Sequence, residues 1–251
     1  QANVRWNCLW ELKPGDDLDL LQLKMEDFVE TRTRSRALFV ESTEQVIGAT
    51  PHFGPQVKSG ISQWAGNITR LGDMALTGHH GIAVGDVDGD GREDIFVCDG
   101  GSLPNRLFRQ LPDGSAEDIS RYAGVDWLED SRAALLIDID NDGDQDLVVA
   151  TIAMVVFAEN DGRGRFTVKG GFPGAQYPFS LCAADYDLDG DLDVYVCVYG
   201  EGDSDSNGRG FETRAPVPFE DARNGGRNVL LENMGGFAFA DATGEVGMEK
   251  N

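Results

Sequence analysis

The chain has 251 residues, with 44 Asp and Glu against 21 Lys and Arg, so its formal net charge is −23. So acidic a surface excludes nucleic-acid binding, which needs basic patches, and disfavours direct docking on anionic lipid. No apolar run approaches the ~20 residues of a membrane span, no signal peptide is recognisable, and the four cysteines are too few for a disulfide framework.

The first residues alternate between apolar and polar side chains. Over residues 4–12 this period of two predicts a strand with one buried face. Trp6 and Trp10 share the apolar side of that pattern, and Trp64 lies on a helical stripe further along. We therefore expect these three indoles in the core, which leaves Trp127 as the one tryptophan free to meet a ligand.

A turn and three further elements complete a small N-terminal unit. Residues 14–17 read Pro-Gly-Asp-Asp and predict a turn. The following run, 18–28, fits a hairpin partner better than the helix that its spacing also allows, and 37–40 predicts a third strand. Across 55–71 the apolar residues fall three and four apart, which predicts a helix. Residues 1–75 are thus expected to form a strand-and-helix domain, and 76–251 a second one.

One acidic phrase then occurs three times, at 86–94, 138–146 and 185–193. Each copy has Asp at positions 1, 3, 5 and 9 and Gly at position 6. Alternating carboxylates place several oxygens inside a tight loop, and glycine permits the positive φ that turns the chain. Oxygen donors at this density suit Ca²⁺, which takes about 6–8 of them. The candidate ligands are Asp86, Asp88, Asp90, Asp94, Asp138, Asp140, Asp142, Asp146, Asp185, Asp187, Asp189 and Asp193.

The flanks of these loops exclude a helix–loop–helix site of the EF-hand type. Such a site needs Glu at position 12, where this chain has Val97, Val149 and Val196. Short apolar runs rich in β-branched and aromatic residues stand before and after each loop and predict buried strands. Each acidic loop therefore connects two strands.

A third apolar run, a Gly-containing turn and a fourth short strand follow each loop. The loops begin 52 and 47 residues apart, which is close to the spacing of four-stranded propeller blades. We expect a mainly β chain with a partial β-propeller of about three blades, over about 81–125, 132–175 and 180–248. Because propellers typically need about four to eight blades, we expect either further blades from a longer parent chain or an arc completed by other segments.

The third repeat carries an insertion of 24 residues within 200–227. A loop of this length either decorates the surface or binds a partner. The cysteines also leave two interpretations open. Cys98 and Cys197 stand at the same place after their loops, as small buried residues would, while Cys182 and Cys197 flank one loop and could be bridged.

The repeats resemble FG-GAP/VCBS repeats. The resemblance is carried by G-D-V-D-G-D-G-R-E-D-I-F-V followed by N-R-L-F and D-G, and the phrases at 105–125 and 228–248 are similar to bacterial relatives of the cartilage acidic protein family. It covers about 80–250 and implies a propeller related to the integrin α-subunit head, with calcium in the loop between the first two strands of each blade. It also implies that the backbone carbonyls at position 7, those of Arg92, Asp144 and Asp191, are ligands.

These observations favour a binding module over an enzyme. Calcium sites of modest affinity are occupied only outside the cytosol, where free calcium is high enough. We therefore expect an extracytoplasmic protein active in interaction or adhesion. Its protein or glycan ligand is expected to bind through the 200–227 loop. The alternative is a carbohydrate-binding or glycan-active module. A catalytic role would rest on His79 and His80, which no hydrolase or nucleotide-binding motif accompanies.

Overall fold

The computed structural model describes residues 2–12, 18–30, 39–58, 81–99, 103–175, 177–198, 202–204, 211–213 and 226–248. The chain divides into two compact units, Gln1–Ser42 and Thr43–Asn251. None of the helices in the described ranges has the length and apolar composition needed to cross a membrane.

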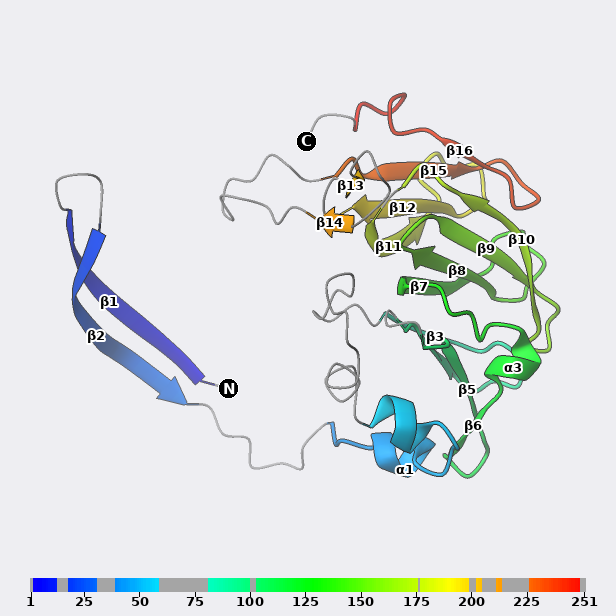
Figure 1. The fold of residues 1–251 in the computed structure, drawn as a ribbon, viewed down its shortest axis with the longest axis horizontal. Coiled ribbons are helices and arrows are strands. Elements are labelled where there is room, and N and C mark those ends of the chain that lie inside the picture. Colours follow the sequence, from blue (N-terminus) through cyan, green and yellow to red (C-terminus); the bar gives the residue numbers. More distant parts are fainter. Residues whose placement is uncertain are drawn as a thin grey trace. The chain divides into compact units, whose positions relative to one another are not determined.

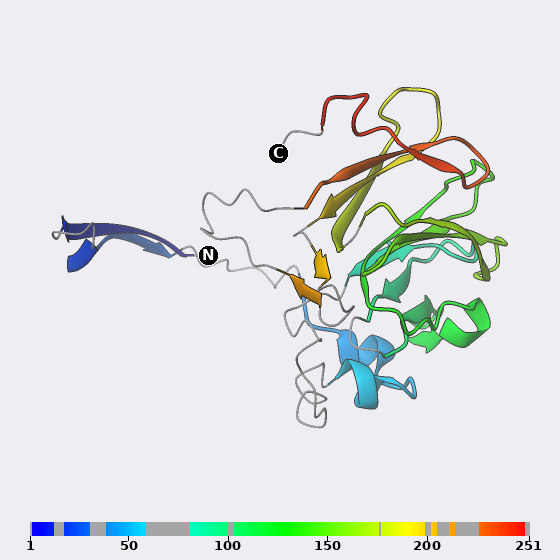
Figure 2. The same cartoon turned by 45° about the horizontal axis from the view of Figure 1, so that its top comes forward.

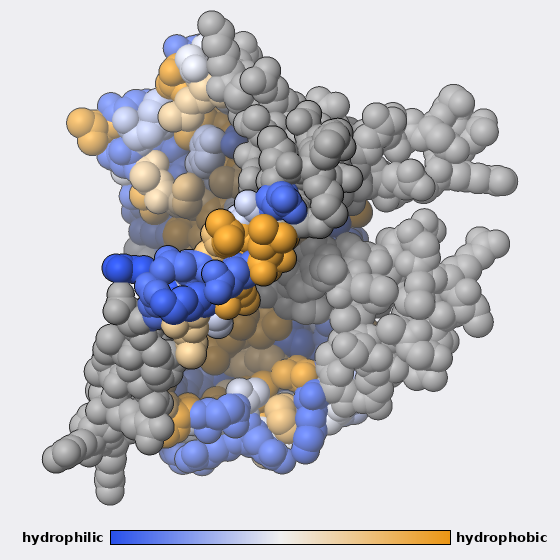
Figure 3. All heavy atoms as spheres, turned by 90° about the vertical axis from the view of Figure 1, so that its left-hand side faces the viewer, coloured by the Kyte–Doolittle hydropathy of each residue, from blue (hydrophilic) through white to orange (hydrophobic). Residues whose placement is uncertain are grey.

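The first unit is an antiparallel hairpin of β1 (Ala2–Leu12) and β2 (Leu18–Glu30). Both strands were predicted, but the prediction that their apolar face is buried was wrong: Trp6 is 51% exposed and Trp10 is 52% exposed. A two-stranded ribbon has no second layer to cover either of its faces. Figure 3 shows apolar and hydrophilic residues side by side on the surface that faces the viewer.

The segment after the hairpin differs from the prediction in two places. Phe39 and Val40, expected at the end of a third strand, are irregular and exposed. Of the predicted helix 55–71, the described part is the end of a π-helical turn, η1 (Phe53–Val57), which follows α1 (Thr43–Ile47). The rest of that helix, Trp64 included, lies outside the described residues.

Residues 43–58 pack against the first sheet of the second unit. Ile47 and Phe53 form a buried cluster with Phe108 and Ala116 of that sheet. The N-terminal unit thus ends at Ser42, whereas the sequence interpretation extended it to residue 75. The reason is a tertiary contact: the apolar side chains of this short helical segment are covered by the sheet.

Three four-stranded antiparallel sheets, one for each repeat, make up the second unit and form a partial β-propeller (Figures 1 and 2). Strand order follows the chain in every sheet. Blade 1 contains β3 (Ile82–Gly85), β4 (Asp94–Val97), β5 (Arg106–Gln110) and β6 (Ala116–Asp118). Blade 2 contains β7 (Ser131–Ile137), β8 (Asp146–Thr151), β9 (Val155–Asn160) and β10 (Phe166–Phe172). Blade 3 contains β11 (Pro178–Ala184), β12 (Asp193–Val198), β15 (Val229–Asn233) and β16 (Phe239–Asp241).

The blades pack face to face, and β8 shows how. All six of its residues are buried, and the four apolar ones alternate between two cores. Leu147 and Val149 face blade 1, while Val148 and Ala150 face blade 3. Because successive side chains of a strand point to opposite faces, a central blade needs an apolar run without polar alternation, which is what the sequence has after the second loop.

Two shorter elements complete the unit. The helical turn α3 (Ser120–Ala123) follows β6 and ends at Gly124, whose φ is 73°. Within the predicted insertion, β13 (Gly202–Ser204) pairs with β14 (Phe211–Thr213), and most of the remainder lies outside the described residues.

The cysteine alternatives are resolved by register. Cys182 lies opposite Tyr195 and Cys197 lies opposite Ser180, and both thiols are free. Cys98 is fully buried, as a small apolar residue would be, and this burial raises the pKa of its thiol to about 12.

Candidate metal centres

Each acidic loop connects the first and second strands of its blade, as the flanks predicted. The chain reverses at two residues with positive φ, at positions 4 and 6. Glycine stands at position 6 in every loop, with φ of 82°, 96° and 101°. Position 4 has Gly89, Asn141 or Leu188, with φ of 72°, 60° and 64°, so only the third loop places a bulky side chain in the left-handed region.

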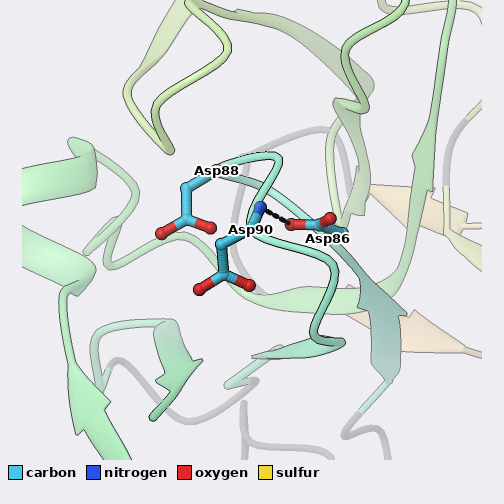
Figure 4. A group of neighbouring side chains, drawn as sticks. All are labelled: Asp86, Asp88 and Asp90. Carbon is cyan, nitrogen blue, oxygen red and sulfur yellow. Dashed lines mark hydrogen bonds between the residues drawn. The ribbon is translucent and has the colours of Figure 1, made fainter. Parts of the chain in front are cut away.

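The position-1 aspartate holds this turn together from inside. In the first loop Asp86 accepts hydrogen bonds from the N–H groups of Asp90, at 3.0 Å, and Gly91, at 2.7 Å. Figure 4 shows the first of these bonds beside the neighbouring carboxylates of Asp88 and Asp90. Asp138 and Asp185 accept the equivalent pairs of bonds in their own loops.

The position-9 aspartate connects the loop to the third strand. Asp94, Asp146 and Asp193 are 0%, 1% and 2% exposed. In each blade one carboxylate oxygen accepts the position-2 N–H at 3.0 Å, and the other accepts the N–H of the last residue of the third strand at 2.8 Å. The same carboxylate therefore fixes both ends of the loop and the blade behind it.

Carboxylate oxygens converge in every loop to a cluster within 4.8 Å of one another. The clusters contain Asp86, Asp88 and Asp90; Asp138, Asp140 and Asp146; and Asp185, Asp187 and Asp193. Positions 1 and 3 thus contribute in all three loops, position 5 in the first, and position 9 in the other two. The position-7 carbonyls of Arg92, Asp144 and Asp191 remain predicted ligands, as do Asp94, Asp142 and Asp189.

Position 3 supplies an observation that points to a cation. One oxygen each of Asp88 and Asp140, Oδ1 in both, is buried and has no hydrogen-bond donor. A buried carboxylate oxygen without a partner is costly. Ca²⁺ prefers hard oxygen ligands such as carboxylates. The residues present therefore suit the ion that the sequence implies.

The pKa values of the loop carboxyls reflect the same crowding. Burial raises the pKa of Asp146 to about 6, against hydrogen bonds from the Asn160 and Ile139 N–H groups, and Asp140 and Asp142 add like-charge repulsion. Burial also raises the pKa of Asp94, Asp140 and Asp187. A divalent cation would remove that repulsion and hold these groups ionised.

Sequence reasoning missed two asparagines, which join the first and second loops to the blade that follows each. Asn160, at the end of β9, donates to the carbonyl of Val87 in the first loop at 2.9 Å. Asn233, at the end of β15, donates to the carbonyl of Ile139 in the second loop, also at 2.9 Å. Both residues stand just before the Gly-containing hairpin turn, and that shared place is the signal that could have identified them.

The other predicted candidates contribute less. His79 and His80 lie outside the described residues. Trp127 is half-buried rather than free, and its indole N–H donates to the Gly124 carbonyl at 2.9 Å. It lines a cavity of about 320 Å³ together with Glu129, Thr151, Ala153, Met154, Val156 and Val168.

Comparison with known proteins agrees with the repeat geometry. A family model described as an FG-GAP-like repeat matches residues 86–149 and 138–196, each match running from one acidic loop through the next. Cartilage acidic protein 1 of Xenopus tropicalis is 30% identical over 164 residues, which cover 57% of this chain and 25% of that protein. The chain therefore spans about a quarter of the length of this relative.

Proposed function

The chain carries FG-GAP-like repeats and is distantly homologous to cartilage acidic protein 1. We propose that it is a calcium-binding propeller module. Each of the three loops takes one Ca²⁺. The ion fixes the geometry of its blade, and the assembled module serves in protein interaction or adhesion outside the cytoplasm.

The observation that carries the proposal is the unpartnered oxygen at position 3. Asp88 Oδ1 and Asp140 Oδ1 are buried and accept no hydrogen bond from the described residues, yet each residue belongs to a cluster of carboxylates within 4.8 Å. Like charges so close repel strongly. The proposed ion supplies both the missing partner and the missing positive charge, while positions 1 and 9 hold the loop by their backbone hydrogen bonds.

Calcium stoichiometry tests this proposal. Isothermal titration of the chelator-treated protein should show three ions per chain, with Mg²⁺ binding far more weakly because it demands a smaller octahedral cage. Asp88→Asn and Asp140→Asn should each reduce the count by one. A protein that binds no Ca²⁺ at millimolar concentration would contradict the proposal.

The chemistry of the ion supports the proposed extracytoplasmic location. Extracellular calcium modules commonly bind at ~10⁻⁴–10⁻³ M, a concentration that the cytosol does not supply. The 200–227 insertion, which includes the β13–β14 hairpin, is the proposed contact for a protein or glycan ligand. Fractionation of the source cells with an antibody against the chain tests the location, and recovery in the cytosol alone would contradict it.

Carbohydrate binding is a second candidate, favoured by the cavity at Trp127. A half-buried indole held by its hydrogen bond to Gly124 offers an aromatic face, and Glu129 offers a carboxylate beside it. A glycan array of the calcium-loaded protein, compared with Trp127→Ala, tests this function. Signal that is absent, or that survives the substitution, would count against it.

A further inference from the structure

The three loops share their aspartates, but at two surrounding positions blade 1 has the opposite charge to the other two blades. One is position 7 of the loop. The other is the residue just before the last residue of the third strand. This position is equivalent in the three blades, because the last residue of the strand donates to the position-9 aspartate in each. Blade 1 has arginine at both, whereas blades 2 and 3 have acidic residues at both: Arg92 and Arg109, against Asp144 and Glu159, and Asp191 and Glu232.

Both arginines contact carboxylates of the first loop. Arg92 forms an ion pair with Asp90, and its Nε donates to the Gln110 carbonyl at 3.3 Å. Arg109 Nη1 lies 3.4 Å from Asp88 Oδ2, and its Nη2 lies 3.3 Å from Glu117. Positions 3 and 5, two of the three groups in this cluster, are therefore partly neutralised by the chain itself.

In blades 2 and 3 the corresponding residues do not supply such a counter-charge. Glu159 pairs with Lys169 at 2.9 Å, and Glu232 accepts the Tyr186 hydroxyl at 3.2 Å. Asp191 accepts a hydrogen bond from Asn141 of the second loop at 2.7 Å, so loops 2 and 3 are directly joined. Glu159 adds like-charge repulsion to Asp140 of the second loop, where the first loop has guanidinium groups.

We propose that the loops fill in a fixed order, loops 2 and 3 first and loop 1 last, because Arg92 and Arg109 compete with the cation for Asp90 and Asp88. The inference rests on the proposed function. An ion entering loop 1 must displace two cationic side chains or bind beside them, whereas in loops 2 and 3 it relieves repulsion. Each partly exposed pair contributes modestly, so two pairs should weaken loop 1 by about tenfold.

This order gives the module two calcium responses. Blades 2 and 3 depend on the ion for charge neutralisation, since no cationic side chain of the described residues pairs with their loop carboxylates. Blade 1 keeps an ordered loop through its arginines and takes up calcium only at concentrations that have already filled the other two sites. Arg92 and Arg109 are thus the residues that set the threshold of the last site.

Calorimetric titration of the chelator-treated wild-type protein tests the order directly. We expect two ions in a first phase and one in a second phase, about tenfold weaker. Asp90→Asn should abolish the second phase alone, and Asp142→Asn should remove one ion from the first. Three ions of equal affinity, or loss of an early ion in Asp90→Asn, would overturn the inference while leaving the proposed function intact.

A substitution that copies blades 2 and 3 into blade 1 tests the cause. Arg92→Asp with Arg109→Glu should merge the two phases. Arg121→Glu, on the exposed face of α3, is the control, because it makes the same change in charge as Arg109→Glu away from the loop and should keep both phases. A second phase that persists in the double variant would overturn the role of the arginines. Absence of all binding would contradict the proposed function itself.

Discussion

At the residue scale, the position-9 aspartate combines two demands that usually conflict. It is buried, which favours the neutral acid, and it accepts two backbone hydrogen bonds, which favour the carboxylate. In Asp146 burial prevails and raises the pKa to about 6. The spacing D-x-D-x-D-G-x-x-D identified this residue, because the motif is local. It could not identify Arg109, whose contact with Asp88 depends on the register between two strands.

Calcium affinity should fall on mild acidification because of Asp146. Its folded pKa lies above its ordinary value of 3.8, so the cation-free fold gains stability from the protonated group below about pH 4 and loses it as pH rises through about 6. Calcium requires the carboxylate, so binding should release a proton at pH 5.5 but not at pH 7.5. Titration in buffers of different ionisation enthalpy measures that release, and identical affinity at both pH values would contradict it.

Leu188 should strain the backbone of the third loop, so that replacing it stabilises the protein. It is 86% exposed, and its φ of 64° is one that side chains with a bulky Cβ rarely adopt. Leu188→Asn should raise the free energy of unfolding by about 0.5–1 kcal/mol, measured in urea with calcium present. Leu128→Asn, at another exposed leucine, should change it by less than about 0.5 kcal/mol. A loss of stability in Leu188→Asn would show that the leucine makes a favourable contact.

At the element scale, strands and loops were predictable and their surroundings were not. The apolar runs around each acidic loop gave the strands of all three blades, because each run is local and each turn has its glycine. Alternation also gave β1, but it does not show whether a second layer exists, so the burial of Trp6 and Trp10 was wrong. The asparagines that join the blades depend on tertiary contacts between residues such as Val87 and Asn160, 73 positions apart.

Those asparagines should stabilise the blade interface. Asn160 is 3% exposed and donates to the carbonyls of Val87 and Gln145. Asn160→Ala leaves these buried acceptors without a partner and should cost about 1–3 kcal/mol in free energy of unfolding. Gln110→Ala is the matched control in blade 1, at the same place relative to its loop. If both substitutions had the same small effect on urea unfolding, the asparagine contacts would be unimportant.

At the scale of the whole molecule, each of the first two loops contacts two blades at once. Position 9 fixes a loop to its own third strand, and the position-2 carbonyls of the first two loops are bound by the blade that follows. Neutralising the loops should therefore stabilise the interfaces as well as the turns. The repeat number and spacing predicted the blades, whereas the boundary at Ser42 depended on the packing of 43–58 against blade 1, which no local pattern shows.

Thermal unfolding in calcium and in chelator tests the central claim most directly. At free calcium about 100-fold above the dissociation constant, each site contributes about 2.7 kcal/mol, so three sites should raise the midpoint by more than about 10 °C. A variant with Asn for Asp90, Asp142 and Asp189 should show a much smaller shift. A wild-type midpoint that is the same in calcium and in chelator would contradict the account of these loops as calcium sites that hold the blades together.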